Sequence, residues 1–530
     1  MAIRLKQLFP RIRKSDPPPY RFPDDLAHAA DLSWFVSRYP LAAADDDLAA
    51  LHEGRLAFDA HQAEMERLLA PAYTPPAYAG LRPGQTVRHY QAQAVELLIR
   101  SGGLLLGDEV GLGKTFTTCA AALKEGALPA AIVCHAHLSK QWCEVVESFT
   151  TLRAHAIKGT RPYNLPAAGV YVFRYSQIFG WADMFETIGP GLVAFDEIQE
   201  LRRGLESDKG RAAARLAAAG RYRLGLSATP IYNYGTEIWR IMDYLRPGLL
   251  GDGAEFTREW TGGMGKISDP SALGAYLREQ YAFLRRTKRD VGQEVPPVNR
   301  IVDTVAHDQD SLSSIDEIAR ALAVKTTMGE FTERGRAARE LDMLVRHRTG
   351  VAKAKSVAAF VRILVESGEP VVLVGWHREV YDIWLTELRD LQPVMFTGSE
   401  TPGAKAQAKA RFVEGKTSLL IMSLRSGAGL DGLQFRCSTM VFGELDWSPG
   451  VHHQCIGRLD REGQTAPVTA IFLVTDEGSD PPMMEVLGLK ASEAARIVDP
   501  SLGVQTVHSD YSHVQALVKR YLAKKERAHG

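Results

Sequence analysis

The chain has 530 residues, of which 45% are hydrophobic and 24% charged, the composition of an ordinary globular protein rather than a disordered one. Its 63 basic and 63 acidic residues give a formal net charge of zero, which excludes attachment to a polyanion through bulk positive charge. At about 150 residues per domain, this length predicts roughly two to four domains. No apolar run approaches the roughly 18 residues needed to cross a bilayer, so we expect no membrane partner.

The five cysteines also constrain the class of protein. Their number is odd and none belongs to a C-x-x-C pair, which argues against a disulfide scaffold and a zinc ribbon. A reducing compartment fits this usage best, and we expect a cytoplasmic protein. The first residues, MAIRLKQLFPRIRK, are basic but lack an apolar core segment, so we interpret them as a solvated start rather than a targeting signal.

Residues 1–80 are predicted to form an accessory region that carries no catalytic chemistry. Prolines interrupt it at Pro17–Pro19 and between Pro71 and Pro76. Between these breaks, Leu48–Leu69 is predicted to be helical. The three acidic residues Asp45–Asp47 just before it are expected to supply the N-cap and to favour the helix dipole.

From about residue 85, short apolar runs alternate with helical segments, which predicts strands of a parallel sheet. Two such α/β blocks are expected, at residues 81–250 and 356–480. The predicted strands lie in GGLLLGDE, AAIVCHA, GVYVFRY, GLVAFDE and YRLGLSA of the first block, and in EPVVLVGWH, QPVMFTG, TSLLIMSL, STMVFGE and APVTAIFLV of the second.

Between and after the blocks we expect helices. Residues 251–355 are predicted to be a mostly helical middle region, and residues 481–530 a basic helical tail. A run of basic residues in the middle region indicates an exposed helix face, or an extension of a track for a polyanion. Its members are Arg334, Arg336, Arg339, Arg346, Arg348, Lys353 and Lys355.

The string LLLGDEVGLGKTFTT follows a predicted strand and opens a predicted helix, which is the context of a phosphate-binding loop. At Gly111 and Gly113 the backbone amides could approach phosphates without a Cβ clash, and the helix N-terminus favours the anion. Lys114 would contact the β and γ phosphates of ATP, and the Thr115 hydroxyl would bind Mg²⁺. Asp108 stands where the strict motif has its first glycine. The other interpretation is a glycine-rich turn of an unrelated α/β protein.

A nucleotide site of this kind also needs a carboxylate at the end of a neighbouring strand. GLVAFDEIQ places Asp196 and Glu197 there, 82 residues after Lys114. Asp196 is the candidate metal ligand, and Glu197 the candidate general base for the attacking water. In isolation, such a pair would be an ordinary polar strand end.

The second block contributes HHQCIGRLDREGQ, which carries Gln454, Arg458 and Arg461. The two arginines are three residues apart, so on a helix they would share one face. An arginine supplied by another lobe stabilises the charge that develops in phosphoryl transfer. A surface salt-bridge face is the alternative, but the second block has no phosphate loop of its own, which favours a shared nucleotide site.

Taken in order, these strings resemble superfamily-two helicases, and specifically the Swi/Snf-like DNA translocases, over roughly residues 80–475. LRPGQTVRHYQAQAVELL is similar to the adenine-reading segment, with Gln91 as its glutamine, and DEVGLGKT to the family's phosphate loop. RHRTGVAKAKSVAAFVRILVESGEPVVLV and ELDWSPG look most like the fork-remodelling or annealing-helicase branch and its bacterial relatives. The family's DEAH or DESH box is here DEIQ, with Gln199 in place of the histidine.

The resemblance implies two tandem RecA-like lobes, with ATP and Mg²⁺ as cofactors and double-stranded DNA as partner. It implies that Gln454 and Arg458 act on the nucleotide and that Arg461 is an arginine finger. It also implies a prokaryotic, nucleoid-associated location. The DNA-contact candidates that follow from it lie after predicted strand ends: Lys140, Trp142, Tyr175, Ser176, Thr397, Gly398, Ser399, Arg425 and Ser426.

Three functions remain open at this point. The first is a translocase driven along duplex DNA by ATP. The second is a strand-separating helicase on DNA or RNA. The third is an ATP-gated subunit that positions other protein subunits in a larger complex, for example in phage defence.

Overall fold

The protein is described by a computed structural model. It covers residues 1–13, 15–228, 236–262, 267–292, 298–313, 324, 331–424 and 430–485. These residues form two compact units. The first comprises Met1–Asp108 and Gly113–Arg285, and the second comprises Glu109–Leu112 and the described residues from Arg286 onward. The basic tail expected at 481–530 lies almost entirely outside the described residues.

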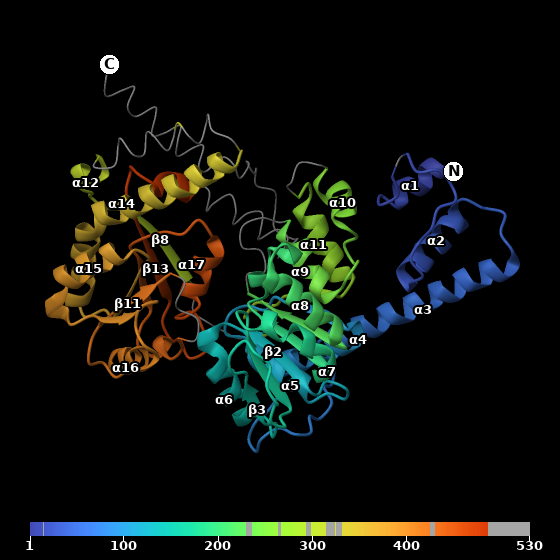
Figure 1. Ribbon diagram of the computed structural model, residues 1–530, viewed down its shortest axis with the longest axis horizontal. Coiled ribbons are helices and arrows are strands. Elements are labelled where there is room, and N and C mark those ends of the chain that lie inside the picture. Colours follow the sequence, from blue (N-terminus) through green and yellow to red (C-terminus); the bar gives the residue numbers. More distant parts are fainter. Residues whose placement is uncertain are drawn as a thin grey trace. The chain divides into compact units, whose positions relative to one another are not determined.

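A parallel sheet forms the centre of the first unit (Figure 1). Its strands are β1 (Gly103–Leu106), β2 (Ala130–Cys134), β3 (Ala154–Ala156), β4 (Val170–Arg174), β5 (Leu192–Asp196), β6 (Tyr222–Leu226) and β7 (Phe283–Leu284). The strand order is β3-β4-β2-β5-β6-β1-β7. In register, Leu226 of β6 lies opposite Leu106 of β1 on one side and Asp196 of β5 on the other. The carboxyl ends of these three strands therefore meet at one edge of the sheet.

The five strands expected in the first block are confirmed as β1, β2, β4, β5 and β6. Strands β1 and β2 are buried along their whole length, as parallel strands covered on both faces should be. The flanking helices are α4 (His89–Ser101), α5 (Lys114–Ala122), η1 (Ala136–Leu138), α6 (Ser139–Phe149), η2 (Ile178–Met184), α7 (Phe185–Ile188), η3 (Ile198–Leu201), η4 (Gly204–Glu206), α8 (Asp208–Ala219), α9 (Glu237–Leu245), α10 (Gly253–Phe256), η5 (Thr257–Thr261) and α11 (Pro270–Glu279).

The accessory region contains three helices, α1 (Ala2–Leu8), α2 (Leu26–Arg38) and α3 (Asp45–Leu69). The helix predicted at Leu48–Leu69 is confirmed as α3, but its start differs from the expectation. The N-cap is Ala44, without a side-chain cap, and the three aspartates occupy the first turn, where they still favour the helix dipole. Helices α2 and α3 pack closely, since a Cβ at Gly54 would lie 2.6 Å from the Cβ of Ala29.

The second unit also contains a parallel sheet, with strand order β10-β11-β9-β12-β13-β8. Its strands are β8 (Val298–Thr304), β9 (Val371–Gly375), β10 (Val394–Phe396), β11 (Leu419–Ser423), β12 (Thr439–Phe442) and β13 (Val468–Val474). The five strands expected in the second block are confirmed as β9 to β13. Strand β8 was not expected, because it lies in the region predicted to be mostly helical. It is an exposed edge strand, so its sequence VNRIVDT has no apolar run to reveal it.

The helices of the second unit are α12 (Gln309–Ser313), α14 (Phe331–Glu366), α15 (Arg378–Glu387), η6 (Arg389–Leu391), α16 (Pro402–Val413), η7 (Leu433–Phe435) and α17 (Pro449–Ile456). Helix α14 continues through the boundary expected at 355/356 and packs on the sheet core through Val357 and Val361.

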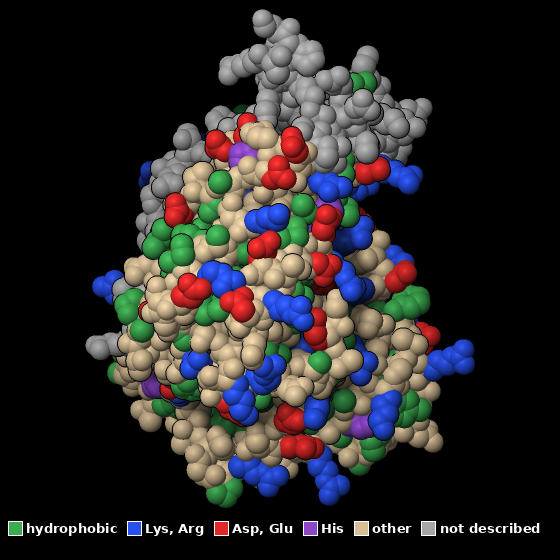
Figure 2. All heavy atoms as spheres, turned by 90° about the vertical axis from the view of Figure 1, so that its left-hand side faces the viewer, with side chains coloured by type: hydrophobic (Ala, Val, Ile, Leu, Met, Phe, Trp, Pro, Cys, Tyr) green, Lys and Arg blue, Asp and Glu red, His purple; other side chains and the backbone are tan. Residues whose placement is uncertain are grey.

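In Figure 2, basic and acidic side chains are interspersed over the visible face, which agrees with the formal net charge of zero. No helix within the described ranges is long and apolar enough to span a lipid bilayer.

The basic run on α14 is not uniformly a solvated face. Lys353 is 1% exposed, and its ammonium contacts the Asp480 carboxylate and the Leu473 carbonyl oxygen, each at 2.6 Å. Asp480 in turn accepts a hydrogen bond from the Thr475 backbone N–H. Lys353 is therefore an internal cross-link between α14, β13 and the segment after it, and it is not available to a polyanion.

Replacing Lys353 with alanine should strongly destabilise the second unit. The substitution leaves the Asp480 carboxylate buried without its cation, which costs about 3–5 kcal/mol in comparable sites. Urea unfolding of the full chain, followed by fluorescence and circular dichroism, should show this loss in the free energy of unfolding. Lys355→Ala is the matched control, because Lys355 is exposed on the same helix. Equal unfolding midpoints for the two variants would contradict the expectation.

Candidate active site

The predicted phosphate loop joins β1 to α5, and Lys114 is the first residue of that helix. Gly111 and Gly113 adopt left-handed backbone conformations, with φ of 95° and 73°. A Cβ at Gly113 would lie 2.7 Å from the Gln91 side-chain nitrogen, so the loop needs glycine there for both space and conformation. Gln91 is buried on α4, and its side-chain oxygen accepts a hydrogen bond from the Arg88 N–H at 3.0 Å. The predicted adenine-reading glutamine therefore lies against the phosphate loop.

The Lys114 ammonium is held at the loop by the carbonyl oxygen of Asp108, at 2.6 Å. Burial lowers the pKa of Lys114, while the nearby carboxylates of Asp108, Glu197 and Asp196 act in the opposite direction. These carboxylates are close enough to influence the ammonium. The structure thus brings the predicted lysine and the predicted acidic pair together within the first unit.

The two acidic residues lie where β5 ends. Asp196 is the last residue of the strand, and Glu197 follows in a left-handed conformation with φ of 54°, which is unusual for a residue other than glycine. Gln199 is 4% exposed, and its side-chain amide donates a hydrogen bond to a Glu197 carboxylate oxygen at 2.5 Å. The glutamine of the DEIQ box therefore orients the candidate general base directly.

The oxygen donors present suit Mg²⁺. Among the described residues, no group of three or more His, Cys, Asp or Glu side chains could hold a metal ion. Mg²⁺ does not require such a group, because it commonly takes one or two protein oxygens and completes its shell with nucleotide phosphates and water. The Asp196 carboxylate and the Thr115 hydroxyl are hard oxygen donors of the kind that would suit this mode.

In the second unit, Gln454 lies on α17, which ends at Ile456. Arg458 and Arg461 therefore follow the helix in a turn, and do not share a helix face as the spacing alone suggested. The Arg461 side chain donates to the Gly457 carbonyl oxygen at 3.1 Å. Burial, together with the charge of Arg458, lowers the pKa of Arg461 to about 10. The carboxylates of Asp431 and Asp460 act on the pKa of Arg461 in the opposite direction, so its guanidinium lies among charges of both signs.

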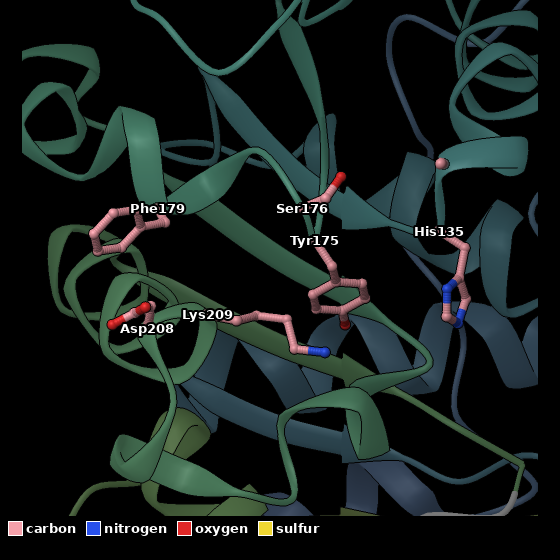
Figure 3. A pocket seen from close by; sticks show the side chains of 7 residues that line it. His135, Tyr175, Ser176, Phe179, Asp208 and Lys209 are labelled. Carbon is pink, nitrogen blue, oxygen red and sulfur yellow. The ribbon is translucent and has the colours of Figure 1, made fainter.

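A pocket of about 500 Å³ opens at the carboxyl ends of β2 and β4 in the first unit (Figure 3). Of the DNA-contact candidates, Tyr175 and Ser176 line it. Its remaining lining residues are His135, Ala136, Phe179, Asp208 and Lys209, which the sequence did not single out. The only sequence signal for Lys209 was a charged residue at the start of a helix, which is too common to be informative.

The remaining DNA-contact candidates lie in different environments. Lys140 is largely exposed and lies 3.6 Å from Glu144 in the same helix. Trp142 is 3% exposed, and its indole N–H donates to the Asp196 carboxylate at 2.9 Å, so the structure favours an internal role for it over contact with DNA. Thr397 is also buried, and its hydroxyl donates to Glu400.

Gly398 and Ser399 are exposed just after the carboxyl end of β10, where a DNA backbone could reach them. Arg425 and Ser426 lie outside the described residues. The described candidates therefore differ in exposure: Lys140, Ser176, Gly398 and Ser399 are exposed, whereas Trp142, Tyr175 and Thr397 are buried. Their common position after strand ends did not reveal this difference.

Comparison with known proteins shows which family this chain resembles. The family model described as SNF2-related domain matches residues 31–349. An uncharacterized ATP-dependent helicase, YqhH, of Bacillus subtilis (strain 168) is 24% identical over 469 residues, covering 80% of this chain and 82% of that protein. Another relative, from Xenopus tropicalis, is also 24% identical, over 81% of this chain and 47% of that protein. It is named SWI/SNF-related matrix-associated actin-dependent regulator of chromatin subfamily A-like protein 1.

The chain thus spans about half the length of its vertebrate SWI/SNF-related relatives. Among solved structures, a Sulfolobus solfataricus SWI2/SNF2 ATPase core in complex with double-stranded DNA aligns with a TM-score of 0.41 at 18% identity, covering 81% of this chain and 96% of that one. The family model spans more than half of this chain, and the first unit carries Lys114 and the strand-end carboxylates of Asp196 and Glu197. The protein belongs to the SNF2-related family of helicase superfamily two.

Proposed function

We propose that this protein is a motor that hydrolyses ATP to move along double-stranded DNA. The observation that carries the proposal is the convergence, at one edge of the first sheet, of Lys114 with Asp196 and Glu197. That set of groups binds and hydrolyses a nucleoside triphosphate in P-loop enzymes. Membership of the SNF2-related family, and relatives named as ATP-dependent helicases or SWI/SNF-related proteins, support a nucleic-acid substrate.

Each candidate site residue in the first unit has a proposed role in ATP hydrolysis. Gln91 reads the adenine, and Lys114 neutralises the phosphate charge. Thr115 and Asp196 would hold Mg²⁺, which supplies further positive charge to the phosphates when bound. Glu197 accepts the proton of the attacking water, and its hydrogen bond from Gln199 keeps the carboxylate oriented toward that task.

We further propose that Gln454, Arg458 and Arg461 act on the same nucleotide, with Arg461 as the arginine finger. ATP would then make contacts in a closed state of the protein that are lost in an open one. A ligand shifts a conformational equilibrium only through such a difference in contacts. Hydrolysis removes the difference, so each cycle of closing and opening can advance the protein along DNA.

The pocket in the first unit is the proposed contact for the DNA backbone there. The Lys209 ammonium, the His135 ring and the exposed Ser176 hydroxyl offer the charge and hydrogen-bond donors that phosphates accept. Asp208 opposes them but is engaged by Arg211. Contacts of this type do not depend on the identity of the bases, so binding should tolerate any DNA sequence and weaken as the salt concentration rises.

We propose that the protein acts in the cytoplasm of a prokaryote, at the nucleoid.

The test is ATP hydrolysis by the full chain with no nucleic acid, single-stranded DNA, duplex DNA or RNA. Duplex DNA should stimulate turnover most, and the duplex-bound protein should displace the third strand of a triplex without separating a forked duplex. Lys114→Ala should abolish both signals. Stimulation by RNA alone would overturn the proposal.

The other outcomes point to the competing functions. Efficient unwinding of the fork would indicate a strand-separating helicase. Tight ATP binding with no stimulation by any nucleic acid would indicate an ATP-gated subunit, whose nucleotide state positions other proteins.

A further inference from the structure

Asp196 is held by two side chains from outside its own strand. The Trp142 indole N–H, on α6, donates to a carboxylate oxygen of Asp196 at 2.9 Å. The Tyr175 hydroxyl, just after β4, donates to the backbone carbonyl oxygen of Asp196, also at 2.9 Å. Both aromatic side chains are buried, at 3% and 6% exposed. Strand order explains the meeting, because β2 lies between β4 and β5 and places the segments after all three ends side by side.

We propose that Trp142 and Tyr175 are positioning residues for Asp196, and that Tyr175 links the occupancy of the pocket to the orientation of this carboxylate; the second part rests on the proposed function. A hydrogen bond from an indole N–H fixes which carboxylate oxygen faces away from it. Partners of this kind influence a metal ligand strongly, because they set the direction in which it points. Tyr175 fixes the backbone of the same residue.

Tyr175 belongs to the pocket as well as to the strand end. Its ring has the Lys209 ammonium 5.3 Å from its centroid, and lies edge-on to the His135 ring at 5.9 Å. In Figure 3, Tyr175 and Lys209 lie between His135 at one end and Phe179 and Asp208 at the other.

The Lys209 ammonium is shared with Glu200, whose carboxylate lies 2.8 Å away. A phosphate in the pocket would compete with Glu200 for this cation. It would thereby change the charge that rests against the Tyr175 ring, while the hydroxyl of the same ring holds Asp196. A single rigid aromatic side chain thus connects the pocket to the backbone of Asp196, whose carboxylate is the proposed metal ligand.

The positioning part is tested by nucleotide binding, without turnover. The Kd of a fluorescent ADP analogue is measured for the full chain in Mg²⁺ and in EDTA. Trp142→Phe keeps an aromatic side chain but removes the indole N–H donor, and should reduce the gain in affinity that Mg²⁺ provides by about tenfold, the low end for loss of a partner to a metal ligand. The Kd in EDTA should stay unchanged. Trp181→Phe is the control, because that buried indole donates to Gly159 instead. An unchanged Mg²⁺ gain in Trp142→Phe would overturn this part.

The coupling part is tested with Tyr175→Phe, which removes only the hydroxyl and keeps the ring in the pocket. In the wild type, duplex DNA should shift the Kd of the Mg²⁺–ADP analogue, since coupled sites influence each other reciprocally. Tyr175→Phe should lose this shift, and Tyr244→Phe should keep it, because the buried Tyr244 hydroxyl has no hydrogen-bond partner among the residues that the structure describes. An equal shift in both variants would overturn the coupling.

The experiments distinguish a failure of either part of this inference from a failure of the proposed function. If duplex DNA alters neither turnover nor the Kd in the wild type, then both the proposed function and the coupling are wrong, while the Mg²⁺ comparison still decides the role of Trp142. If Trp142→Phe fails to fold, the Mg²⁺ gain of Tyr175→Phe against that of Tyr244→Phe decides whether Asp196 is positioned from outside its strand.

Discussion

Replacing Arg461 with alanine should lower the DNA-stimulated rate of ATP hydrolysis by roughly 10³-fold or more, the scale at which an arginine finger acts. The physical reason is that negative charge spreads over the phosphoryl oxygens only as the transition state forms, and a guanidinium placed to meet it stabilises that state more than bound ATP. The turnover number should therefore fall while the Kd for ATP changes little. Steady-state hydrolysis and equilibrium nucleotide binding, measured on the same preparation, separate the two quantities.

A lysine at this position should restore little of the activity. It keeps the positive charge but lacks the planar fork that meets two oxygens at once. Arg389→Ala is the matched control, because Arg389 is an exposed arginine of the same unit and should leave turnover unchanged. An Arg461→Ala variant whose turnover stays within about tenfold of the wild type would assign the arginine a surface role instead.

Glutamine in place of Glu197 should lower the hydrolysis rate by roughly 10²–10⁴-fold, the usual contribution of a positioned general base. The substitution preserves the shape of the side chain, and its carbonyl oxygen can still accept the hydrogen bond that Gln199 donates. What it removes is the ability to take a proton from the attacking water. ATP should therefore bind normally and remain intact, which single-turnover measurements and a binding titration can show.

The control for this change is Glu186→Gln, which neutralises an exposed carboxylate on α7 of the same unit. Its turnover should match the wild type. If Glu197→Gln hydrolyses ATP at nearly the wild-type rate while Lys114→Ala does not, the water is activated by a different group, and the left-handed conformation of Glu197 serves the backbone rather than the chemistry.

Residues that act through local sequence could be predicted without a structure. The phosphate loop is a continuous string between a strand and a helix, so Gly111, Gly113 and Lys114 could be assigned from their order alone. Asp196 and Glu197 follow an apolar run whose burial as β5 required no knowledge of its neighbours. The two-sheet architecture also follows from the alternation of apolar runs with helical segments, because buried parallel strands need apolar residues on both faces.

Features that depend on long-range contacts could not be predicted in this way. Strand β8 is polar and exposed at a sheet edge, so only its pairing with β13 reveals it. The basic run on α14 gave no sign that Lys353 is turned inward to Asp480, which is 127 residues further along the chain.

Trp142 is the clearest example of a residue whose environment could not be predicted from the sequence. Its position after a strand end suggested a surface contact, yet it lies inside and meets Asp196, 54 residues away. Local sequence indicates which groups are suited to binding a triphosphate, and it correctly predicts most of the segments that become strands. The tertiary structure alone decided which of the nearby side chains face the nucleotide site from within, because hydrophobic periodicity specifies what is buried but not the order in which the buried strands lie side by side.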